Sequence, residues 1–524
     1  MKTVCTGFFW LMVLIGFFMS PPVFGASVAE GRQEASKKPS KEERADAEPM
    51  ALSLQDFVQL VREKNERISS QAAQLSISQE AVSSAKSIFE PAFVGSYKRE
   101  EIERQNTVQD AVSQGFLPEF EEKSHNYQGG VEGLVPTGGR LWLGYTQKDF
   151  KNSVANQYGV DGESQTGIEA NLTQPLLKNG GIRTTMAGIK VAEADADIEF
   201  QTYRNQMMQV IADAISTYWD LYIAREKYEV IEDSVDIAAK LLSHNRVRVA
   251  TGKMAETEVL EAEAGLAIRK SLQSEAEQQV ILATNSVRSL FSLSVADNQL
   301  SIKPTDRIEI KPLETNFETS LAKAFKMRAE YISSRRKVER EDIRVVYAKN
   351  QRWPQLDLKG SYGLNGLARS SRDSVDETLS KKHPNWTLGV ELRIPLGGDI
   401  KGRSELEASR QRKRQALLEL KAVEISLANT TDTAIRGVQS ALDQLRQYIS
   451  VIDFNERLLE AEVARFRGGK SNSRLVLEKE GNLLQAKEAR LDSLLKYKKA
   501  LLGLEMAEGS LLLNHGIEIK EVDL

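Results

Sequence analysis

The sequence has almost no cysteine, and its prolines leave two long stretches empty. Cys5 is the only cysteine among 524 residues, so the chain beyond it offers no disulfide, no thiolate metal ligand and no cysteine nucleophile. None of the 13 prolines falls within residues 176–303 or 396–524. Because proline breaks helix interiors, these two stretches of similar length predict two copies of a very long helical unit.

Neither sign of charge is in large excess. The chain has 70 Lys and Arg against 74 Asp and Glu, a net charge of -4, which lacks the basic excess of a nucleic-acid-binding surface. Its four histidines are scattered without the spacing of metal ligands, and no serine-nucleophile motif is present. We therefore expect no enzyme, no metal or other cofactor, and no nucleic-acid partner.

Long apolar runs are missing except at the start of the chain. Lys2 precedes an apolar run over residues 8–19, and small residues follow up to Gly25, which predicts a secretory signal peptide over residues 1–25. Residues 26–50 mix charges with Ser, Pro and Ala and predict a disordered leader. No later apolar run reaches 18 residues, so any membrane spanned by the mature chain must be crossed by strands.

Two segments follow one plan at an offset of 263 residues. Helical spacing of apolar residues before Pro91 recurs before Pro354, and each proline opens a glycine-rich region. Pro175 and Pro395 close these regions and mark the expected junctions of strand with helix. We predict a first repeat over residues 51–303 (helix 52–90, strands 91–175, long helix 183–250, return helix 256–293), a linker over 304–316, a second repeat over 317–513 (helix 317–353, strands 354–395, long helix 401–467, return helix 474–513) and a tail over 514–524.

Both long helices carry the seven-residue apolar repeat of a coiled coil. At about 1.5 Å per residue each would be about 100 Å long. Each ends in a glycine turn, at Gly252 or at Gly468 and Gly469, after which the apolar seam resumes. Each long helix is therefore expected to fold back on itself as an antiparallel hairpin.

The glycine-rich regions predict strands because apolar and polar residues alternate there, most clearly over 386–394. A partner strand is expected over 356–362, another over 168–173, and a further hairpin over 127–146. A soluble sandwich is the alternative. Four or six strands are too few to close a barrel, which needs about eight, so other copies of the chain would have to pair the edges. Three copies would give 12 or 18 strands.

The signal peptide, the duplicated plan and Gln174-Pro175-Leu176 before the long helix together resemble the TolC-like outer membrane efflux protein family over residues 52–513. The resemblance implies a mainly α fold with β structure, in which duplicated coiled-coil hairpins form an α-barrel and strands contribute to a trimeric transmembrane β-barrel. A structural or adhesive coiled-coil protein of the cell envelope is the alternative. A periplasmic adaptor is a third, but adaptors have one hairpin and this sequence has two.

Family membership would make the chain a passive exit duct of a tripartite efflux or type I secretion system. The expected assembly is a homotrimer in outer-membrane lipid of a Gram-negative-type bacterium, extending into the periplasm. Its expected partners are a periplasmic adaptor (membrane fusion) protein and an inner-membrane pump of RND or ABC type.

The resemblance also assigns residues at the two hairpin tips. The tips, which would dock the adaptor, consist of Gly252, Lys253, Gly468, Gly469 and Lys470. Family acids follow the tip glycines, and Glu258 and Glu478 match them, while Leu475 and Phe466 replace a usual acid and a usual tyrosine. We expect these four side chains to form a mixed apolar and acidic periplasmic constriction. A solvated coiled-coil face is the alternative for Glu478.

Overall fold

The structure is a computed structural model that describes residues 50–291, 302–306, 308, 310, 316–517 and 519. The expected signal peptide, nearly all of the expected leader, and parts of the expected linker and tail lie outside these residues. In chain order the elements are β1 (Met50–Leu52), α2 (Leu54–Lys64), α3 (Glu66–Lys86), η1 (Ser87–Phe89), β2 (Ala92–Gln105), α4 (Val108–Ser113), β3 (Glu119–Leu134), β4 (Arg140–Asn152), α5 (Ser153–Gln157), β5 (Glu163–Pro175), α6 (Ile182–Thr185), α7 (Ala187–Ala250), α8 (Thr257–Arg288), β6 (Ile302–Pro304), α9 (Phe317–Met327), α10 (Ala329–Gln351), β7 (Gln355–Ala368), α11 (Ser371–Leu379), β8 (Pro384–Arg393), α12 (Ile400–Arg467), α13 (Ser473–Glu508) and α14 (Leu511–Asn514).

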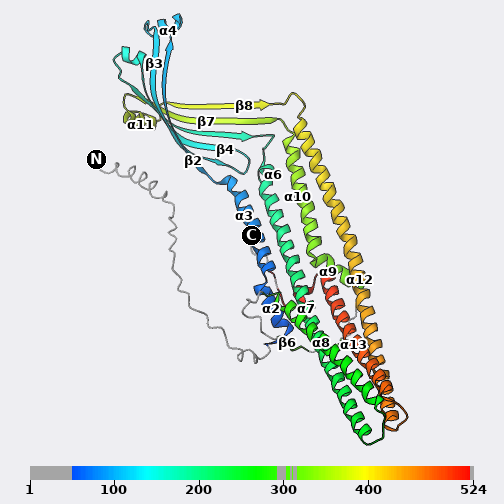
Figure 1. Cartoon of the computed structure of the whole chain (residues 1–524). Coiled ribbons are helices and arrows are strands. Elements are labelled where there is room, and N and C mark those ends of the chain that lie inside the picture. The colour runs from blue at the N-terminus through cyan, green and yellow to red at the C-terminus, as the bar shows by residue number, and fades with distance from the viewer. Residues whose placement is uncertain are drawn as a thin grey trace, which may run out of the picture. The chain divides into compact units, whose positions relative to one another are not determined.

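Two antiparallel helical hairpins form one end of the molecule, and a sheet forms the other (Figure 1). The helices α7 and α12 are unbroken over 64 and 68 residues, which is about 100 Å each. The helix α8 returns along α7, and α13 returns along α12. Since α13 also packs against α7, the two hairpins are joined within a single chain.

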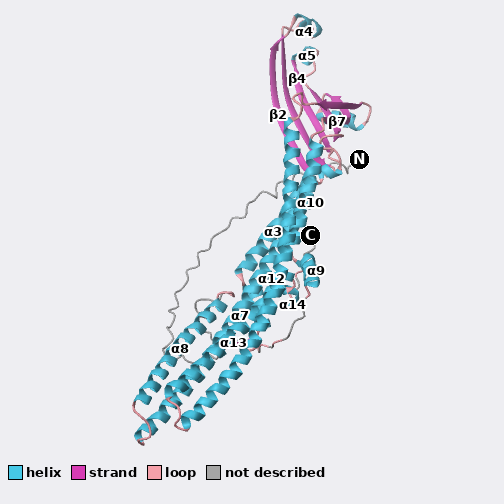
Figure 2. Cartoon of the chain, turned by 90° about the vertical axis from the view of Figure 1, so that its right-hand side faces the viewer, coloured by secondary structure: helices cyan, strands magenta, loops and turns pink. Residues whose placement is uncertain are grey.

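The shorter helices complete the wall nearer the sheet (Figure 2). There α3 packs against α7, and α10 packs against both α7 and α12. Beyond them, toward the tips, α8 takes the place of α3 and α13 takes the place of α10. The wall of one chain is therefore four helices wide along its length.

The helices expected over 52–90 and 317–353 are each broken in two, at positions that are again 263 residues apart. The backbone leaves the helical region at Asn65 (ψ 123) and at Arg328 (ψ 120). The Asn65 side chain accepts hydrogen bonds from the N–H groups of Arg67 and Ile68 and donates one to the Leu290 carbonyl at 2.8 Å. Asn65 thus caps α3 while it fastens the break to the end of α8.

A short parallel pair, β1 with β6, links the start of the first repeat to the connection between the repeats. The buried Tyr218 hydroxyl on α7 fastens this pair, since its single proton is shared between the Leu52 carbonyl (3.0 Å) and the Asp306 carboxylate (2.5 Å). Burial, and then the bond to Asp306, raises the pKa of Tyr218. Phe57 stacks on the Tyr218 ring and Phe291 packs edge-on against Phe57, so this belt is a main hydrophobic core of the chain.

The long strands form one antiparallel sheet in the order β2-β3-β4-β5-β7-β8. Four strands come from the first repeat and two from the second, and β5 pairs with β7 across the repeats. The regions expected to be strands also contain the short helices α4, α5 and α11 in their connections. Among the described residues, no helix combines the length and the apolar character needed to cross a membrane.

Candidate functional site

The two hairpin tips are turns of the same geometry. Gly252 and Gly469 have φ values of +67° and +74°, a region that residues with a Cβ rarely adopt. After each glycine a lysine N–H, that of Lys253 or Lys470, donates back to the carbonyl of Arg248 or Arg465 at 2.9 Å. The glycines and lysines are exposed, so each tip presents free backbone and one lysine side chain to a partner.

Glu258, predicted at the constriction, binds within its own chain. Its carboxylate accepts a hydrogen bond from the N–H of Ser473, the first residue of α13, at 2.7 Å. Asn245 on α7 donates to the Glu258 carbonyl (3.0 Å) and to the Ser473 hydroxyl (2.7 Å). A carboxylate at a helix N-terminus is favoured by the helix dipole, so Glu258 ties the first hairpin to the second.

Phe466 also lies between the hairpins. Its side chain is buried, and the Arg248 guanidinium stands over the ring at 5.6 Å from the centroid. Arg248 donates in addition to the Arg467 carbonyl at 3.3 Å. Glu258 and Phe466 therefore both join the two hairpins near their tips.

Glu478 and Leu475, by contrast, have side chains that are at least partly exposed on α13. The Glu478 carboxylate is half exposed and pairs with Lys479 at 2.9 Å, and this hydrogen bond, together with the lysine charge, lowers the Glu478 pKa. Leu475 is partly exposed in the first turn of the same helix, which Asn472 caps. Residues three apart share a helix face, so Leu475 and Glu478 present one apolar and one acidic group side by side.

A buried ion pair lies farther from the tips and was not predicted from the sequence. Arg269 on α8 and Glu480 on α13 are 6% and 4% exposed. One carboxylate oxygen accepts from two guanidinium nitrogens, and the other accepts from the Ser234 hydroxyl of α7 at 2.5 Å. The remaining Arg269 N–H groups reach the carbonyls of Gly265 and Leu477. Three helices from both hairpins thus meet at one satisfied polar cluster.

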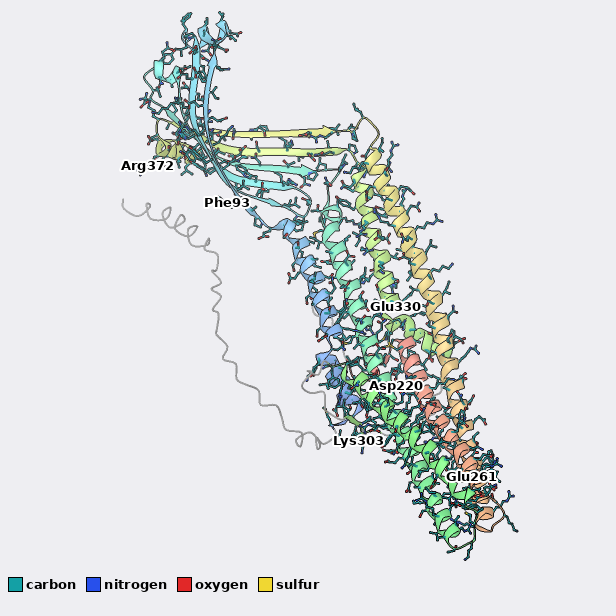
Figure 3. The ribbon with its side chains drawn as sticks, in the orientation of Figure 1. Phe93, Asp220, Glu261, Lys303, Glu330 and Arg372 are labelled. Atoms are coloured by element: carbon teal, nitrogen blue, oxygen red, sulfur yellow. The ribbon has the colours of Figure 1, made fainter. Side chains whose placement is uncertain are left out.

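A signal for this pair does exist in the sequence. Arg269 lies three residues after Leu266, and Glu480 lies three residues after Leu477, each at the next position of the apolar seam. Opposite charges at seam positions of the two return helices indicate an ion pair inside a coiled coil. Exposed pairs continue the contact between α7 and α13, among them Asp220 with Lys499 at 2.8 Å, and Figure 3 shows Asp220 partway along α7.

The expected junction prolines lie where the sheet meets the helices. Pro175 is the last residue of β5, and Pro395 follows the end of β8 by two residues. Asp399 then caps α12 by accepting from the Gly402 N–H. A hollow of about 1080 Å³ opens at this junction, and side chains of both charges line it, including Arg344 and Glu405.

A chain with a sheet at one end, a wall of helices about 100 Å long and exposed turns at the other end is built as one sector of a hollow duct. The class of protein that this defines is a channel. The model of the family described as outer membrane efflux protein matches residues 141–292 and 330–510, one match in each repeat. The chain belongs to this family.

The chain is also similar to individual outer membrane and secretion proteins. The outer membrane protein TolC of Vibrio cholerae is 22% identical over 344 residues, which cover 65% of this chain and 76% of TolC. The proteases secretion protein PrtF of Dickeya chrysanthemi is 21% identical over 281 residues, which cover 52% of this chain and 55% of PrtF. The crystal structure of the Campylobacter jejuni CmeC outer membrane channel has a TM-score of 0.62 at 15% identity, covering 94% of this chain and 95% of CmeC.

These findings confirm the expected fold class and family. The chain is an exit duct of the outer membrane that extends into the periplasm. Its family and fold are those of channel proteins.

Proposed function

We propose that three copies of this chain assemble into the exit duct of a tripartite efflux or type I secretion system. The observation that carries the proposal is that neither the helical wall nor the sheet of one chain closes on itself. Within the described residues, the helical wall is four helices wide and the sheet ends in two strands, β2 and β8, that each have one neighbour. A threefold ring of such sectors closes both layers at once and encloses a continuous passage.

The hairpin tips are the proposed docking site for a periplasmic adaptor. Both tips lie at the end of the molecule away from the sheet, as Figure 1 shows, and both have the same turn geometry. A trimer would present six such turns in a ring, each with an exposed lysine, Lys253 or Lys470. This repeated surface suits a ring-shaped partner that contacts every turn in the same way, at Gly252, Gly468 and Gly469 as well as at the two lysines.

The proposed periplasmic constriction consists of Glu478, Leu475, Glu258 and Phe466. Glu478 and Leu475 present exposed surface there, while Glu258 and Phe466 also hold together the hairpins that carry them. Glu478 is exposed and its pKa is lowered, so it is ionised at neutral pH. Three such carboxylates around a narrow entrance would favour cations, and the leucines would narrow the opening. If α13 turns this face outward, Glu478 lies on a solvated surface instead.

An inner-membrane pump of RND or ABC type would supply the energy. Similarity extends both to TolC and to PrtF, whose name concerns the secretion of proteases, so both efflux and type I secretion fit the chain. The duct itself would conduct passively. Its tips would bind the adaptor and its constriction residues would attract or repel ions, and neither supplies energy for transport.

The proposal is tested with two cysteine variants of the full-length protein, Lys253→Cys and Lys470→Cys. Since Cys5 lies in the expected signal peptide, each new thiol is the single site for a photoreactive cross-linker in the mature chain. We expect both variants to capture one periplasmic adaptor, and a pump to purify with it. The control Lys349→Cys carries its thiol on an exposed position of α10 near the sheet and should capture neither.

The same preparations report the assembly state. Membrane extracts in mild detergent should contain a trimer that dissociates on heating and forms conducting pores in planar bilayers. A monomer without conductance, or equal capture by the Lys349→Cys control, would contradict the proposed function.

A further inference from the structure

The first repeat has one hairpin more than the second. In the second repeat one hairpin, β7 with β8, connects α10 to α12, whereas in the first repeat four strands connect α3 to α7. The strand after α3 is β2 and the strand before α7 is β5, so the hairpin of β3 and β4 is the addition. Duplication by itself would give four strands per chain in the membrane-spanning sheet. The added hairpin makes six if it belongs to that sheet.

The added hairpin is continuous with the rest of the sheet. The strand β2 pairs with β3 along 14 residues, and β4 pairs with β5 along 11, so β3 and β4 separate β2 from β5. The turn of the hairpin is anchored where the long helix begins. The Thr137 carbonyl accepts from the Gly181 N–H (3.0 Å) and from the Gln174 side chain (3.1 Å).

In the half nearer the helices, one face of the sheet is apolar across all six strands. Exposed apolar side chains on this face of the added strands include Tyr127 and Val131 on β3 and Leu141 and Leu143 on β4. They continue the row that begins at Phe93, labelled on β2 in Figure 3. Across the sheet one register row reads Phe93, Val131, Leu143, Ala170, Tyr362 and Trp386.

The opposite face is mostly polar on the same strands. Lys98, Thr146, Glu169, Lys359 and Glu391 all point there, because they alternate with the apolar positions. A sheet with an apolar face toward lipid and a polar face toward water is the pattern of a membrane-spanning closed sheet. The pattern includes β3 and β4 on equal terms with the other strands.

The two open edges match each other in direction. The strand β2 leaves the helical half and β8 returns to it, with antiparallel pairing at every step between them. A second copy that places its β2 beside β8 would therefore continue the antiparallel order. Strand edges exposed to lipid would leave backbone groups unpaired in a medium without water, which is strongly unfavourable, so these edges require such a partner.

We infer that β8 of each copy pairs with β2 of the next, and that three copies close a sheet of eighteen strands that includes the β3–β4 hairpin. This inference rests on the proposed trimer and fixes the composition of its wall. A closed ring of eighteen strands is wide enough to leave an aqueous channel, and its diameter grows about linearly with strand number. The added hairpins would therefore widen the outer-membrane segment by about half relative to a ring of twelve.

The register of the sheet allows closure when Leu392 of one copy is set opposite Phe93 of the next. The row that starts at Phe93, near the helical end of β2, reaches β8 at Trp386, six residues before Leu392 near the helical end of β8 (392 minus 386). Six residues at about 3.3 Å, over six strands at about 4.8 Å each, correspond to a strand tilt of about 35°. This value lies in the range of about 35 to 45° found for transmembrane sheets of this kind.

The test of the edge pairing is the double variant Ser96→Cys with Gly389→Cys. With Leu392 opposite Phe93 of the next copy, these two positions face each other on the polar side. We expect mild oxidation with copper phenanthroline to convert the detergent-solubilised trimer into covalently linked dimers and trimers on a non-reducing gel. The control pair Thr146→Cys with Gly389→Cys should remain monomeric, and it would cross-link only if β4 were the edge.

The test of the added hairpin uses nitroxide labels at Val131→Cys and Leu143→Cys, with Leu388→Cys on β8 as the reference. We expect all three labels to be accessible to oxygen dissolved in lipid and protected from a water-soluble nickel complex. Access of the nickel complex to Val131→Cys and Leu143→Cys, or cross-linking through Thr146→Cys, would overturn the eighteen-stranded ring even in a conducting trimer. Loss of the trimer itself would contradict the proposed function instead.

Discussion

Arg269 and Glu480 hold positions on the return helices that a coiled coil usually gives to apolar residues. Their cluster with Ser234 satisfies the carboxylate from two sides and fixes α8, α13 and α7 in one register. A buried ion pair contributes less to stability than its geometry suggests, because both charges are desolvated. Its larger effect is on specificity, since any shift of one hairpin along the other would leave a buried charge without its partner.

The variant Arg269→Met should therefore be strongly destabilised, by about 3 to 5 kcal/mol, because Glu480 remains buried and unpaired. Urea denaturation followed by the helical circular dichroism signal measures this change. The control Arg246→Met removes a pair with Glu263 that is largely exposed, and should cost less than about 1 kcal/mol. The double variant Arg269→Met with Glu480→Leu should recover most of the loss, and equal losses in Arg269→Met and Arg246→Met would refute the role of the cluster.

The stability of the fold should depend on pH through Glu488 on α13. Burial raises the pKa of this carboxyl above 4.5, Lys227 lowers it, and Asp492 and Glu275 raise it further. The folded state therefore binds the Glu488 proton more tightly than the unfolded state does. This contribution to stability is fully present below 4.5 and is lost as the pH rises through the folded pKa.

Replacing Glu488 with Gln should accordingly raise the urea midpoint at neutral pH and leave it unchanged in acid, where the native carboxyl is already protonated. The variant Glu478→Gln is the matched control, because the pKa of Glu478 is lowered rather than raised. It should not stabilise the fold at neutral pH. A Glu488→Gln variant with the native pH profile would show that the carboxyl is solvated.

At the scale of single elements, the hairpin turns depend on one glycine each. Gly469 has φ +74°, whereas the adjacent Gly468 has φ -78°, which any residue adopts. We expect Gly469→Ala to destabilise the second hairpin by about 1 to 2 kcal/mol and Gly468→Ala to be nearly neutral. The urea midpoints of the two variants measure this difference, and equal midpoints would contradict the assigned turn.

The elements were predictable from the sequence to different degrees, for physical reasons. The coiled-coil seam and the proline gaps identify the long hairpins because packing repeats every seven residues over their whole length. The breaks at Asn65 and Arg328 were missed because apolar spacing continues on both sides of each break. The outer halves of β2 and β3 were also missed, since charges on both faces near Glu101 and Lys123 hide the alternation there.

At the scale of the whole molecule, the duplicated plan and the family followed from the sequence, but the contacts of two residues near the tips did not. Glu258 and Phe466 match positions near the tips, yet the structure uses both to join hairpins within one chain. Their partners, Ser473 and Arg248, lie 215 and 218 residues away in sequence. No local pattern reports contacts of that separation.

Conductance of the trimer tests the constriction. We expect Glu478→Gln to reduce the preference for cations about fivefold, because an ionised carboxylate near the entrance is worth about 1 kcal/mol to a passing cation in water. Reversal potentials across a planar bilayer with a salt gradient measure this preference. The control Glu63→Gln removes an exposed carboxylate from α2 and should leave selectivity unchanged. Unchanged selectivity in Glu478→Gln would place that carboxylate outside the pore.

The interrupted helices have a mechanical consequence. In each chain α7 and α12 run as unbroken columns, while α3 with α8 and α10 with α13 are shorter pieces that succeed one another along the wall. Axial load therefore passes from tips to sheet through two columns per chain. The gap between α3 and α8 lies at the belt around Tyr218, so this belt holds the ends of the shorter pieces against the unbroken α7.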